Sequence, residues 1–383
     1  MTGRLLVGLM SGTSCDGVDA VLASFSGTPG AADFSARVLA HAQRSYSASF
    51  RGRLLRLPGA RAPELARLDR ELAERFAEAV SDALQLAGVA RDDVRAVACA
   101  GHTAVHLPPD EHDEGGTLVL GDGDRIAALC GLPVLSELRA ADRAVGGMGA
   151  PLVPFADACL LRDPERPVAT LNLGGIANLT WIPPEGAPLA FDTGPGNMLL
   201  DALVHSRSNG EQTHDSGGAL GLAGEPDLAW LQRTLATDDF VSAAPPKSTG
   251  RERYGASFLR THAAALDALS LRDACATLAA YTVECVVHAL RTHTPAPPAQ
   301  LVVSGGGALN DCLMHGLRAR LPEVLVADSE AALGVPVFAR EALAMALLAD
   351  ASLLELPGNV PGVTGARRAV RLGKLSPGPR SWR

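Results

Sequence analysis

Near the start of the chain, a turn of small and polar residues lies between two apolar runs. It reads Ser11-Gly12-Thr13-Ser14-Cys15-Asp16-Gly17, with Leu5–Met10 before it and Val18–Phe25 after it. This pattern predicts a β-hairpin, and successive backbone N–H groups in such a turn can bind an anion. The carboxylates of Asp16 and Asp19 repel a phosphate unless a cation lies between them. The stretch therefore indicates either a nucleotide–metal turn or a hairpin with a polar tip.

Two more glycine-rich turns follow predicted strands farther along the chain. Gly174-Gly175 comes after residues 168–173, and Gly305-Gly306-Gly307 comes after residues 299–304. Because apolar strands run into glycine turns in both halves of the chain, we expect two related lobes, each with a mixed sheet. Three separated turns predict a nucleotide site in a cleft between two lobes.

The two common phosphate-binding fingerprints do not occur in this sequence. A Walker A motif needs glycines before its Lys-Ser pair, whereas Lys247-Ser248 follows Pro245-Pro246. A Rossmann fingerprint needs a third glycine at the position where this chain has Asn310. The sequence therefore argues against a P-loop or a Rossmann dinucleotide site.

A further glycine-rich turn follows a predicted strand and begins with a carboxylate. Asp192 follows the apolar stretch Leu189–Phe191 and comes directly before Thr193-Gly194-Pro195-Gly196-Asn197, after which a helix is predicted near Met198. A carboxylate at a strand end, beside a glycine-rich helix start, is expected to face a cleft.

Two other polar stretches carry chemical groups. Glu137–Pro154 is a connection rich in glycine and proline that holds Arg139 and Asp142 three residues apart. It is either a solvated loop or the place of a domain hinge or substrate grip. His102 and His106 lie four residues apart without a Cys or carboxylate at metal-site spacing. We expect them to form hydrogen bonds rather than to bind a metal.

Apolar periodicity alternates between strands and helices, which predicts an α/β fold. Strands are expected at residues 5–10, 18–25, 37–45, 95–100, 117–121, 132–136, 168–173, 177–182, 189–191, 299–304 and 323–327, and helices at 63–88, 125–130, from 198, across 227–293 and at 337–349. We expect a first lobe at 1–148 and a second at 149–344, with the segment from about 345 to 383 packed back on the first. The last ten residues are expected to be loose.

The composition narrows the class of partner. Hydrophobic residues make up 47% and charged residues 20% of the 383 residues, as in a globular protein. The formal net charge of −8 argues against nucleic acid or an anionic membrane as the main partner. Seven scattered cysteines without a CxxC pair fit reduced thiols. No run approaches the ~18 apolar residues that a membrane span needs, so we expect a cytoplasmic protein.

Six motifs resemble, in order and nearly over the whole chain, the anhydro-N-acetylmuramic acid kinase family. They are GLMSGTSCDGVDAV, GGMGAPLVP, NLGGIANLT, FDTGPGNMLLDA, PPKSTGRE and SGGGALN, with VTGA at 363–366. The resemblance implies a two-lobed fold of the actin, hexokinase and Hsp70 type with ATP in the cleft. It also implies a homodimer that recycles cell-wall sugars. The implied reaction opens the 1,6-anhydro bridge with water and phosphorylates the released O6.

The resemblance also implies roles for individual residues. Asp192 matches the catalytic base. Mg²⁺ is expected with ATP, held through water by Asp16. The implied ATP-binding residues are Gly12, Thr13, Ser14, Cys15, Asp16, Gly17, Val18, Asp19, Gly174, Gly175, Gly305, Gly306, Gly307 and Asn310. The implied sugar-binding residues are Arg139 and Asp142, as a substrate grip, together with Gly196 and Asn197.

Several positions, most of them on the substrate side, depart from the family pattern. They are Ala100, His102, Val119, Glu137, Leu138 and Asp157. These departures leave open a kinase of the same fold that acts on another 1,6-anhydrosugar, such as levoglucosan. A second alternative is an actin-like nucleotide switch without sugar chemistry, against which the retained Asp192 argues. Lys247 is one of only two lysines in the chain and hints at a site that needs an ammonium group.

Overall fold

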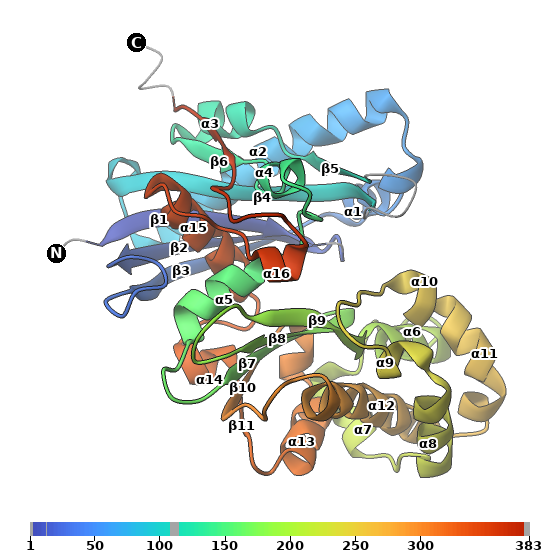
Figure 1. Ribbon diagram of the computed structural model, residues 1–383. Helices are drawn as coiled ribbons and strands as arrows, with labels where there is room; N and C mark the ends of the chain where they lie inside the picture. Colours follow the sequence, from blue (N-terminus) through green and yellow to red (C-terminus); the bar gives the residue numbers. More distant parts are fainter. Residues whose placement is uncertain (1–2, 13, 108–114, 379–383) are drawn as a thin grey trace. The chain divides into compact units, whose positions relative to one another are not determined.

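The computed structural model describes residues 3–12, 14–107 and 115–378. The chain forms two compact units, one made of Met1–Leu161 with Ala339–Arg383 and the other of Arg162–Phe338. Each unit contains a mixed β-sheet with helices packed against it (Figure 1). The predicted α/β class is confirmed.

The sheet of the first unit has seven strands in the order β12-β6-β4-β1-β2-β3, with β5 paired to β4. The first three strands are antiparallel, whereas β4 runs parallel to β1 and β6 runs parallel to β4. The strands are β1 (Arg4–Ser11), β2 (Gly17–Ser26), β3 (Ser35–Ser45), β4 (Val94–Leu107), β5 (Gly116–Leu120), β6 (Val134–Ser136) and β12 (Lys374–Ser376). The predicted hairpin is therefore the pair β1–β2.

Two long helices pack on this sheet. Leucine and aromatic residues at three- and four-residue spacing bury one side of α2 (Ala62–Ala87), which packs on β1, β2 and β3. Burial of each such side chain contributes about 1.5–3 kcal/mol. The helix α15 (Arg340–Leu353) packs on β1, β2 and β4. The other helices of this unit are α1 (Ala48–Leu54), α3 (Gly123–Cys130), α4 (Ala140–Ala144), α5 (Val153–Leu161) and α16 (Pro361–Thr364), with short 3-10 turns η1 (Leu57–Gly59) and η2 (Arg91–Asp93).

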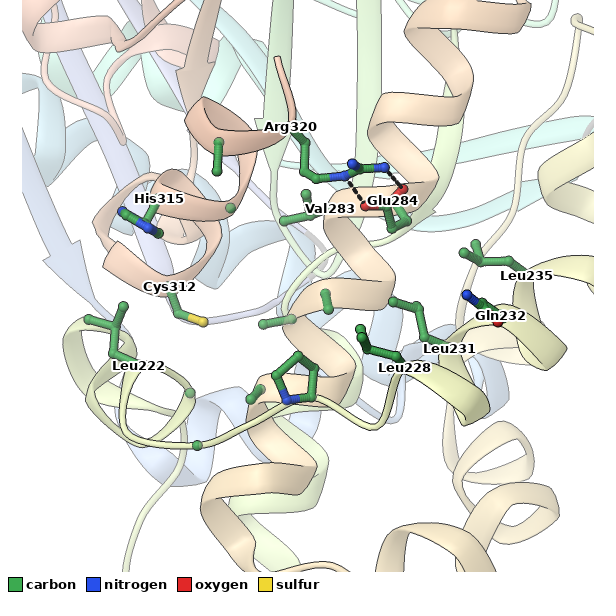
Figure 2. A pocket seen from close by; sticks show the side chains of 18 residues that line it. Leu222, Leu228, Leu231, Gln232, Leu235, Val283, Glu284, Cys312, His315 and Arg320 are labelled. Atoms are coloured by element: carbon green, nitrogen blue, oxygen red, sulfur yellow. Dashed lines mark hydrogen bonds and ion pairs between the residues drawn. The ribbon is translucent and has the colours of Figure 1, made fainter. Parts of the chain in front are cut away.

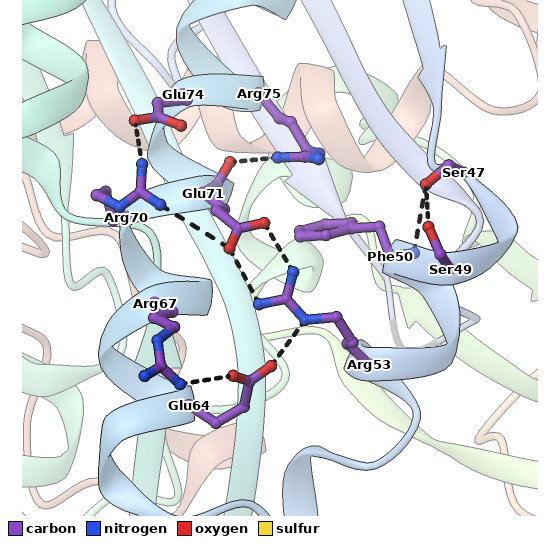
Figure 3. Close-up of polar contacts among 10 residues, drawn as sticks. All are labelled: Ser47, Ser49, Phe50, Arg53, Glu64, Arg67, Arg70, Glu71, Glu74 and Arg75. Atoms are coloured by element: carbon purple, nitrogen blue, oxygen red, sulfur yellow. Dashed lines mark hydrogen bonds and ion pairs between the residues drawn. The ribbon is translucent and has the colours of Figure 1, made fainter.

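An arginine joins α1 to α2 (Figure 3). The guanidinium of Arg53 donates to Glu64 at 2.7 Å and to both carboxylate oxygens of Glu71 at 2.8 and 3.0 Å. The ring of Phe50 lies 3.7 Å from the guanidinium carbon of Arg75. Bidentate pairing fixes the direction of both partners. This set of contacts positions α1, whose Arg51 reaches the β1–β2 turn.

The sheet of the second unit has five strands in the order β11-β10-β7-β8-β9. They are β7 (Val168–Leu173), β8 (Ile176–Ile182), β9 (Leu189–Pro195), β10 (Gln300–Ser304) and β11 (Leu325–Asp328). The helices are α6 (Met198–Arg207), α7 (Ala219–Leu222), α8 (Leu228–Thr237), α9 (Asp239–Ser242), α10 (Arg251–Tyr254), α11 (Ala256–Asp267), α12 (Leu271–Thr292), α13 (Asp311–Arg320) and α14 (Ser329–Leu333), with 3-10 turns η3 (Ser216–Gly218) and η4 (Gly306–Leu309). The long helix α12 is buried along most of its length and packs on β8 and β9.

The two sheets share one connectivity. In each, three antiparallel strands are followed by two that run parallel to the first, so that β3-β2-β1-β4-β6 corresponds to β9-β8-β7-β10-β11. The repeated strand–glycine–strand pattern of the sequence thus reflects a repeated sheet. The parallel strand ends place the loops after β1, β4, β7 and β10 at one edge of their respective sheets.

Four expectations differ from the structure. The Glu137–Pro154 connection contains α4 and the start of α5. The strand expected at 95–100 continues to Leu107, because β5 pairs with its second half. The last ten residues are not all loose, since β12 pairs with β6 and closes the sheet edge. The unit boundary also lies at Leu161 and Ala339, so α5 belongs to the first unit.

Candidate active site

The β1–β2 turn is tightly built. The N–H of Cys15 donates to the carbonyl oxygen of Gly12 at 3.1 Å, and Cys15 itself has a positive φ of 56°. A side-chain carbon at Gly17 would lie 2.5 Å from the carbonyl oxygen of Arg44, so only glycine fits there. Val18 is fully buried in the core. Thr13 lies outside the described residues, and the turn on either side of it has the sharp form that the sequence predicts.

The two acidic residues of this hairpin have different surroundings. Asp16 is largely exposed and pairs with Arg51 of α1 at 3.1 Å. Asp19 pairs with His41 of β3 at 2.8 Å. Magnesium is usually held by one or two carboxylates together with substrate phosphates. A single exposed carboxylate beside a turn of backbone N–H groups fits that donor set.

Several buried polar side chains form hydrogen bonds beneath the β1–β2 turn, on its core side. The hydroxyl of Ser11 shares hydrogen bonds with Tyr46 Oη at 2.9 Å and with His102 Nδ1 at 3.0 Å. The other ring nitrogen of His102 lies 3.8 Å from the thiol of Cys15. Burial lowers the pKa of His102, which favours the neutral ring. His102, where the chain departs from its family, therefore supports the turn from within the core.

In the second unit, the remaining glycine turns come together. The N–H groups of Gly196 and Asn197 donate to the carbonyl oxygens of Gly175 and Gly174 at 2.9 and 2.8 Å. A side-chain carbon at Gly196 would lie 2.2 Å from the Gly174 carbonyl oxygen, so this approach requires glycine. The Asn197 side chain donates to Leu173 at 2.9 Å. The β7–β8 turn and the start of α6 thus form one polar backbone surface.

The Gly305–Gly307 turn adjoins the same surface. A side-chain carbon on Gly307 would lie 2.4 Å from Leu173 and 3.2 Å from the Asn197 side chain. The Asn310 side chain is nearly buried and accepts the N–H of Leu313, so that it caps α13. The described structure therefore brings six of the predicted glycines to one place in the second unit, whereas Asn310 caps the following helix.

Asp192 lies in β9, opposite Asn178 of β8. Its Oδ2 accepts the backbone N–H of Thr249 at 2.9 Å, and its own N–H donates to the carbonyl oxygen of Lys247 at 3.2 Å. Burial raises the pKa of this carboxyl to about 6, and nearby Glu252 adds to the rise, while the Thr249 hydrogen bond opposes it. A base with a pKa near 6 is ionised at neutral pH and can still bind a proton.

Arg139 and Asp142, the two residues of the predicted substrate grip, have different surroundings. Arg139 is half-buried and donates to the Gly149 carbonyl oxygen at 2.9 Å, and burial lowers the pKa of its guanidinium. Asp142 is fully buried. Its carboxylate accepts the Gly149 N–H at 2.8 Å, Asn359 Nδ2 at 2.6 Å and Thr364 Oγ1 at 2.7 Å. Asp142 therefore holds the loop that presents Arg139, together with the C-terminal segment.

Other departures from the family pattern also have structural partners. Asp157 of α5 is buried and forms a bidentate pair with Arg340 of α15, with one bond of 3.0 Å. Leu138 is buried, whereas Glu137 is exposed and has a positive φ of 53°. Val119 would clash with any side chain at Gly101. His106 shares a hydrogen bond with Thr117 at 2.8 Å.

Sequence reasoning missed two acidic residues. Glu341 of α15 has its pKa raised by burial, while the positive charges of Arg340 and Arg139 oppose the rise. Glu252 of α10 raises the pKa of Asp192. The only sequence feature that points to Glu341 is its position beside Arg340 in an alanine-rich helix. Only the position of Glu252 in the PPKSTGRE motif signals that residue.

A cavity in the second unit lies away from these residues (Figure 2). It measures about 600 Å³ and is lined mainly by apolar side chains of α8, α12 and α13, with the Arg320–Glu284 pair at one end. None of the predicted site residues in the described structure lines it. Among the described residues, no three His, Cys, Asp or Glu side chains gather as a metal site. The described helices are too short or too polar to cross a membrane.

Two sheets of one repeated connectivity, with glycine turns at their strand ends, define the class to which actin, hexokinase and Hsp70 belong. Comparison with known proteins then narrows the class. A family model described as anhydro-N-acetylmuramic acid kinase matches residues 4–378. The chain belongs to this family.

Individual relatives agree with that assignment. A protein of Synechococcus elongatus named anhydro-N-acetylmuramic acid kinase is 40% identical over 379 residues, which cover 97% of this chain and 98% of the relative. A protein of the same name from Synechococcus sp. strain CC9605 is 42% identical over 378 residues, covering 96% and 98%. Component A of the (R)-2-hydroxyglutaryl-CoA dehydratase of Acidaminococcus fermentans covers 90% of this chain and 96% of its own, with a TM-score of 0.44 and 13% identity. That weaker likeness carries no part of the assignment.

Proposed function

We propose that the chain is an ATP-dependent kinase of 1,6-anhydro-N-acetylmuramic acid. It opens the 1,6-anhydro ring with water and phosphorylates O6, giving N-acetylmuramic acid 6-phosphate. The observation that carries this proposal is the half-buried carboxyl of Asp192, with a pKa raised to about 6 and one oxygen held by the Thr249 N–H. The family membership supplies the substrate class.

In the proposed reaction, Asp192 accepts a proton from the attacking water. The water oxygen bonds to the anomeric carbon while the bond from that carbon to O6 breaks. The released O6 attacks the γ-phosphorus of ATP, and ADP leaves. Positioning and neutralisation of charge supply most of the rate of such a transfer. The Thr249 N–H, at 2.9 Å, keeps the Asp192 carboxylate in place for this step.

Nucleotide binding is assigned to the three glycine turns. The phosphates are proposed to contact Gly12 to Asp19 and Gly174-Gly175. The nucleoside is proposed to lie beside Gly305–Gly307. The contacts between the Gly174-Gly175 and Gly196-Asn197 backbones support a shared site in the second unit. Mg²⁺ bound with ATP neutralises phosphate charge. Asp16 would hold it through water, and in this structure Asp16 pairs with Arg51.

Sugar binding is assigned to Arg139, Gly196 and Asn197. Because the three bonds to its carboxylate are all internal, we assign Asp142 to hold the Arg139 loop rather than to touch the sugar. Arg139 offers several N–H donors, which suit the carboxylate of a muramic acid. Levoglucosan has no carboxylate, and this difference favours the muramic sugar over the alternative.

We also propose that the protein acts in the cytoplasm as a homodimer, in peptidoglycan recycling. All seven cysteines lie in the described residues and none of them forms a disulfide, which suits a reducing compartment. The homodimer follows from the family resemblance.

Turnover of two sugars by the purified chain tests the proposal. With saturating Mg-ATP, 1,6-anhydro-N-acetylmuramic acid should give a much higher kcat/KM than levoglucosan. An Arg139→Gln variant should lose rate on the muramic sugar and change little on levoglucosan. Faster turnover of levoglucosan would assign the chain to the alternative sugar. Nucleotide binding without turnover of either sugar would favour the switch.

A further inference from the structure

The loop between α9 and α10 touches Asp192 twice through its backbone. The carbonyl oxygen of Lys247 accepts the Asp192 N–H at 3.2 Å. Two residues later, the N–H of Thr249 donates to Asp192 Oδ2 at 2.9 Å. The loop therefore runs along β9 at the candidate base, and its backbone sets the direction of the carboxylate.

Both ends of this loop are fixed by one buried carboxylate. Asp238 accepts the Phe240 N–H at 3.0 Å and so caps α9. The same carboxylate accepts Arg253 Nη2 at 2.7 Å and Tyr254 Oη at 2.8 Å from α10, and Tyr281 Oη from α12. Charge-assisted hydrogen bonds of this kind are strong. The ends of the loop are thus anchored, whereas its middle depends on other contacts.

Lys247 supplies the contact in the middle. Its ammonium donates to the carbonyl oxygens of Phe240 and Val241, both at 2.9 Å. These carbonyls lie at the C-terminal end of α9, where helix carbonyls lack partners within the helix and attract cations. The ammonium also lies 4.9 Å from the Phe240 ring centre and 5.8 Å from that of Phe191, the neighbour of Asp192. Two of its three donors are therefore used within the protein.

We propose that Lys247 is a positioning residue for this reaction: its ammonium fastens the middle of the α9–α10 loop to α9 and so keeps the Thr249 N–H on Asp192. The proposal rests on the proposed role of Asp192. Lys247 acts through the backbone and does not touch the sugar. This assignment explains why the chain has a lysine at a place where its neighbours supply carbonyl oxygens.

Charges around the pair give the proposal a second readout. Lys247 lowers the pKa of Asp192, and Glu252 raises it. Lys247 itself faces Asp238 and Cys285, while burial lowers its own pKa. His293 shares the Val241 carbonyl oxygen at 3.3 Å. Loss of the ammonium should therefore move the pKa of Asp192 upward, and loss of the Glu252 charge should move it downward.

The test compares three substitutions at one position in the full-length enzyme. Lys247→Arg keeps a cation and donors, Lys247→Gln keeps a donor without charge, and Lys247→Met keeps only the apolar stem. Lys374→Met makes the same chemical change at the other lysine, which is exposed on β12 of the first unit. The readouts are kcat, KM for both substrates and the acidic limb of the pH profile.

We expect the loss of kcat to increase from Arg to Gln to Met, reaching about tenfold or more, with an unchanged KM for ATP. The acidic limb should move to higher pH by about half a unit or more in Lys247→Gln and Lys247→Met. It should move to lower pH in Glu252→Gln and stay in place in Lys374→Met. If Lys247→Met does not fold, the comparison of Gln with Arg carries the test.

Two outcomes would overturn the proposal, and a third would point to the base instead. Unchanged kcat and an unmoved acidic limb in Lys247→Gln and Lys247→Met would remove Lys247 from the machinery. A raised sugar KM at constant kcat would make Lys247 a sugar contact instead. The Asp192→Asn variant distinguishes the proposed base role of Asp192 from the proposed positioning role of Lys247. If that variant retains full turnover, the assigned base is wrong, whereas an inactive Asp192→Asn with a normal Lys247→Met refutes only the positioning role.

Discussion

The backbone N–H of Thr249 donates to Oδ2 of Asp192 at 2.9 Å, from a position 57 residues later in the chain. Within the described residues, the Thr249 N–H is the only donor that forms a hydrogen bond with the Asp192 carboxylate. One oxygen is thus held by the protein, and the other remains for a proton from water. A half-buried carboxylate held at one oxygen suits a general base, because its direction is fixed without full neutralisation of its charge.

Removing this base should stop the chemistry but not nucleotide binding. Asp192→Asn keeps an oxygen to accept the Thr249 N–H, yet it cannot take a proton. Product formation should fall by at least about 100-fold, while ATP affinity stays within about twofold. Steady-state rates and calorimetric titration with ATP measure the two quantities. Normal turnover in this variant would contradict the assigned role.

The rate should depend on the ionisation of Asp192. Its pKa is raised to about 6 by burial, and the ionised form is the active one. The kcat/KM for the sugar should therefore be constant near pH 8 and fall about tenfold per unit below about pH 6. Saturating Mg-ATP keeps nucleotide binding out of the profile. A profile that stays flat down to about pH 5 would disagree with this assignment.

The same carboxylate should cost stability. Its folded pKa of about 6 lies above the value of 3.8 for a free Asp. Below about pH 4 the carboxyl is protonated in both the folded and the unfolded state, and the folded protein is at its most stable with respect to this group. That stability is lost as the pH rises through about 6, because the carboxyl then has to be ionised while buried. At pH 8, Asp192→Asn should be more stable to unfolding by about 2–3 kcal/mol. Chemical denaturation at pH 8 and at lower pH measures the gap, which should shrink toward zero near pH 4; a constant gap would exclude this cause.

Asp142 should matter for folding first. Asp142→Ala leaves three buried donors, on Gly149, Asn359 and Thr364, without their acceptor. Each unsatisfied buried group costs about 1–3 kcal/mol, so the free energy of unfolding should drop by about 3–5 kcal/mol. Thr364→Val removes one donor and serves as the matched comparison, with a loss of about 1 kcal/mol. Equal losses in the two variants would show that Asp142 does not organise this loop.

The parts of the fold that depend on local pattern were predictable from the sequence. Apolar runs around Gly12 and Gly17 gave the β1–β2 hairpin, and the three- and four-residue spacing of leucines gave α2. The repeat of strand and glycine indicated two related sheets, which share one connectivity. Asp192 was predicted to be the base because the FDTGPGN motif matches the family pattern, although β9 continues past it to Pro195.

The surroundings of the site depend on distant segments and left little local signal. Asp142 was predicted to contact the substrate. Sequence spacing does not show that Asn359 and Thr364, more than 200 residues away, donate hydrogen bonds to its carboxylate. Asp157 pairs with Arg340 across 183 positions. The strand predicted at 95–100 continues through 107, because its second half pairs with β5. Such partners are set by packing, which sequence spacing does not reveal.

The central claim is that hydration and phosphorylation occur together. It is tested most directly by mass spectrometry of the product formed from 1,6-anhydro-N-acetylmuramic acid and ATP in ¹⁸O-water. The account predicts N-acetylmuramic acid 6-phosphate with one ¹⁸O atom at the anomeric carbon, and none on the phosphoryl group. Mutarotation does not add label to that position, but slow exchange does, so the product is sampled at early times. A phosphorylated sugar that keeps its anhydro ring, or that carries no label, would contradict the account.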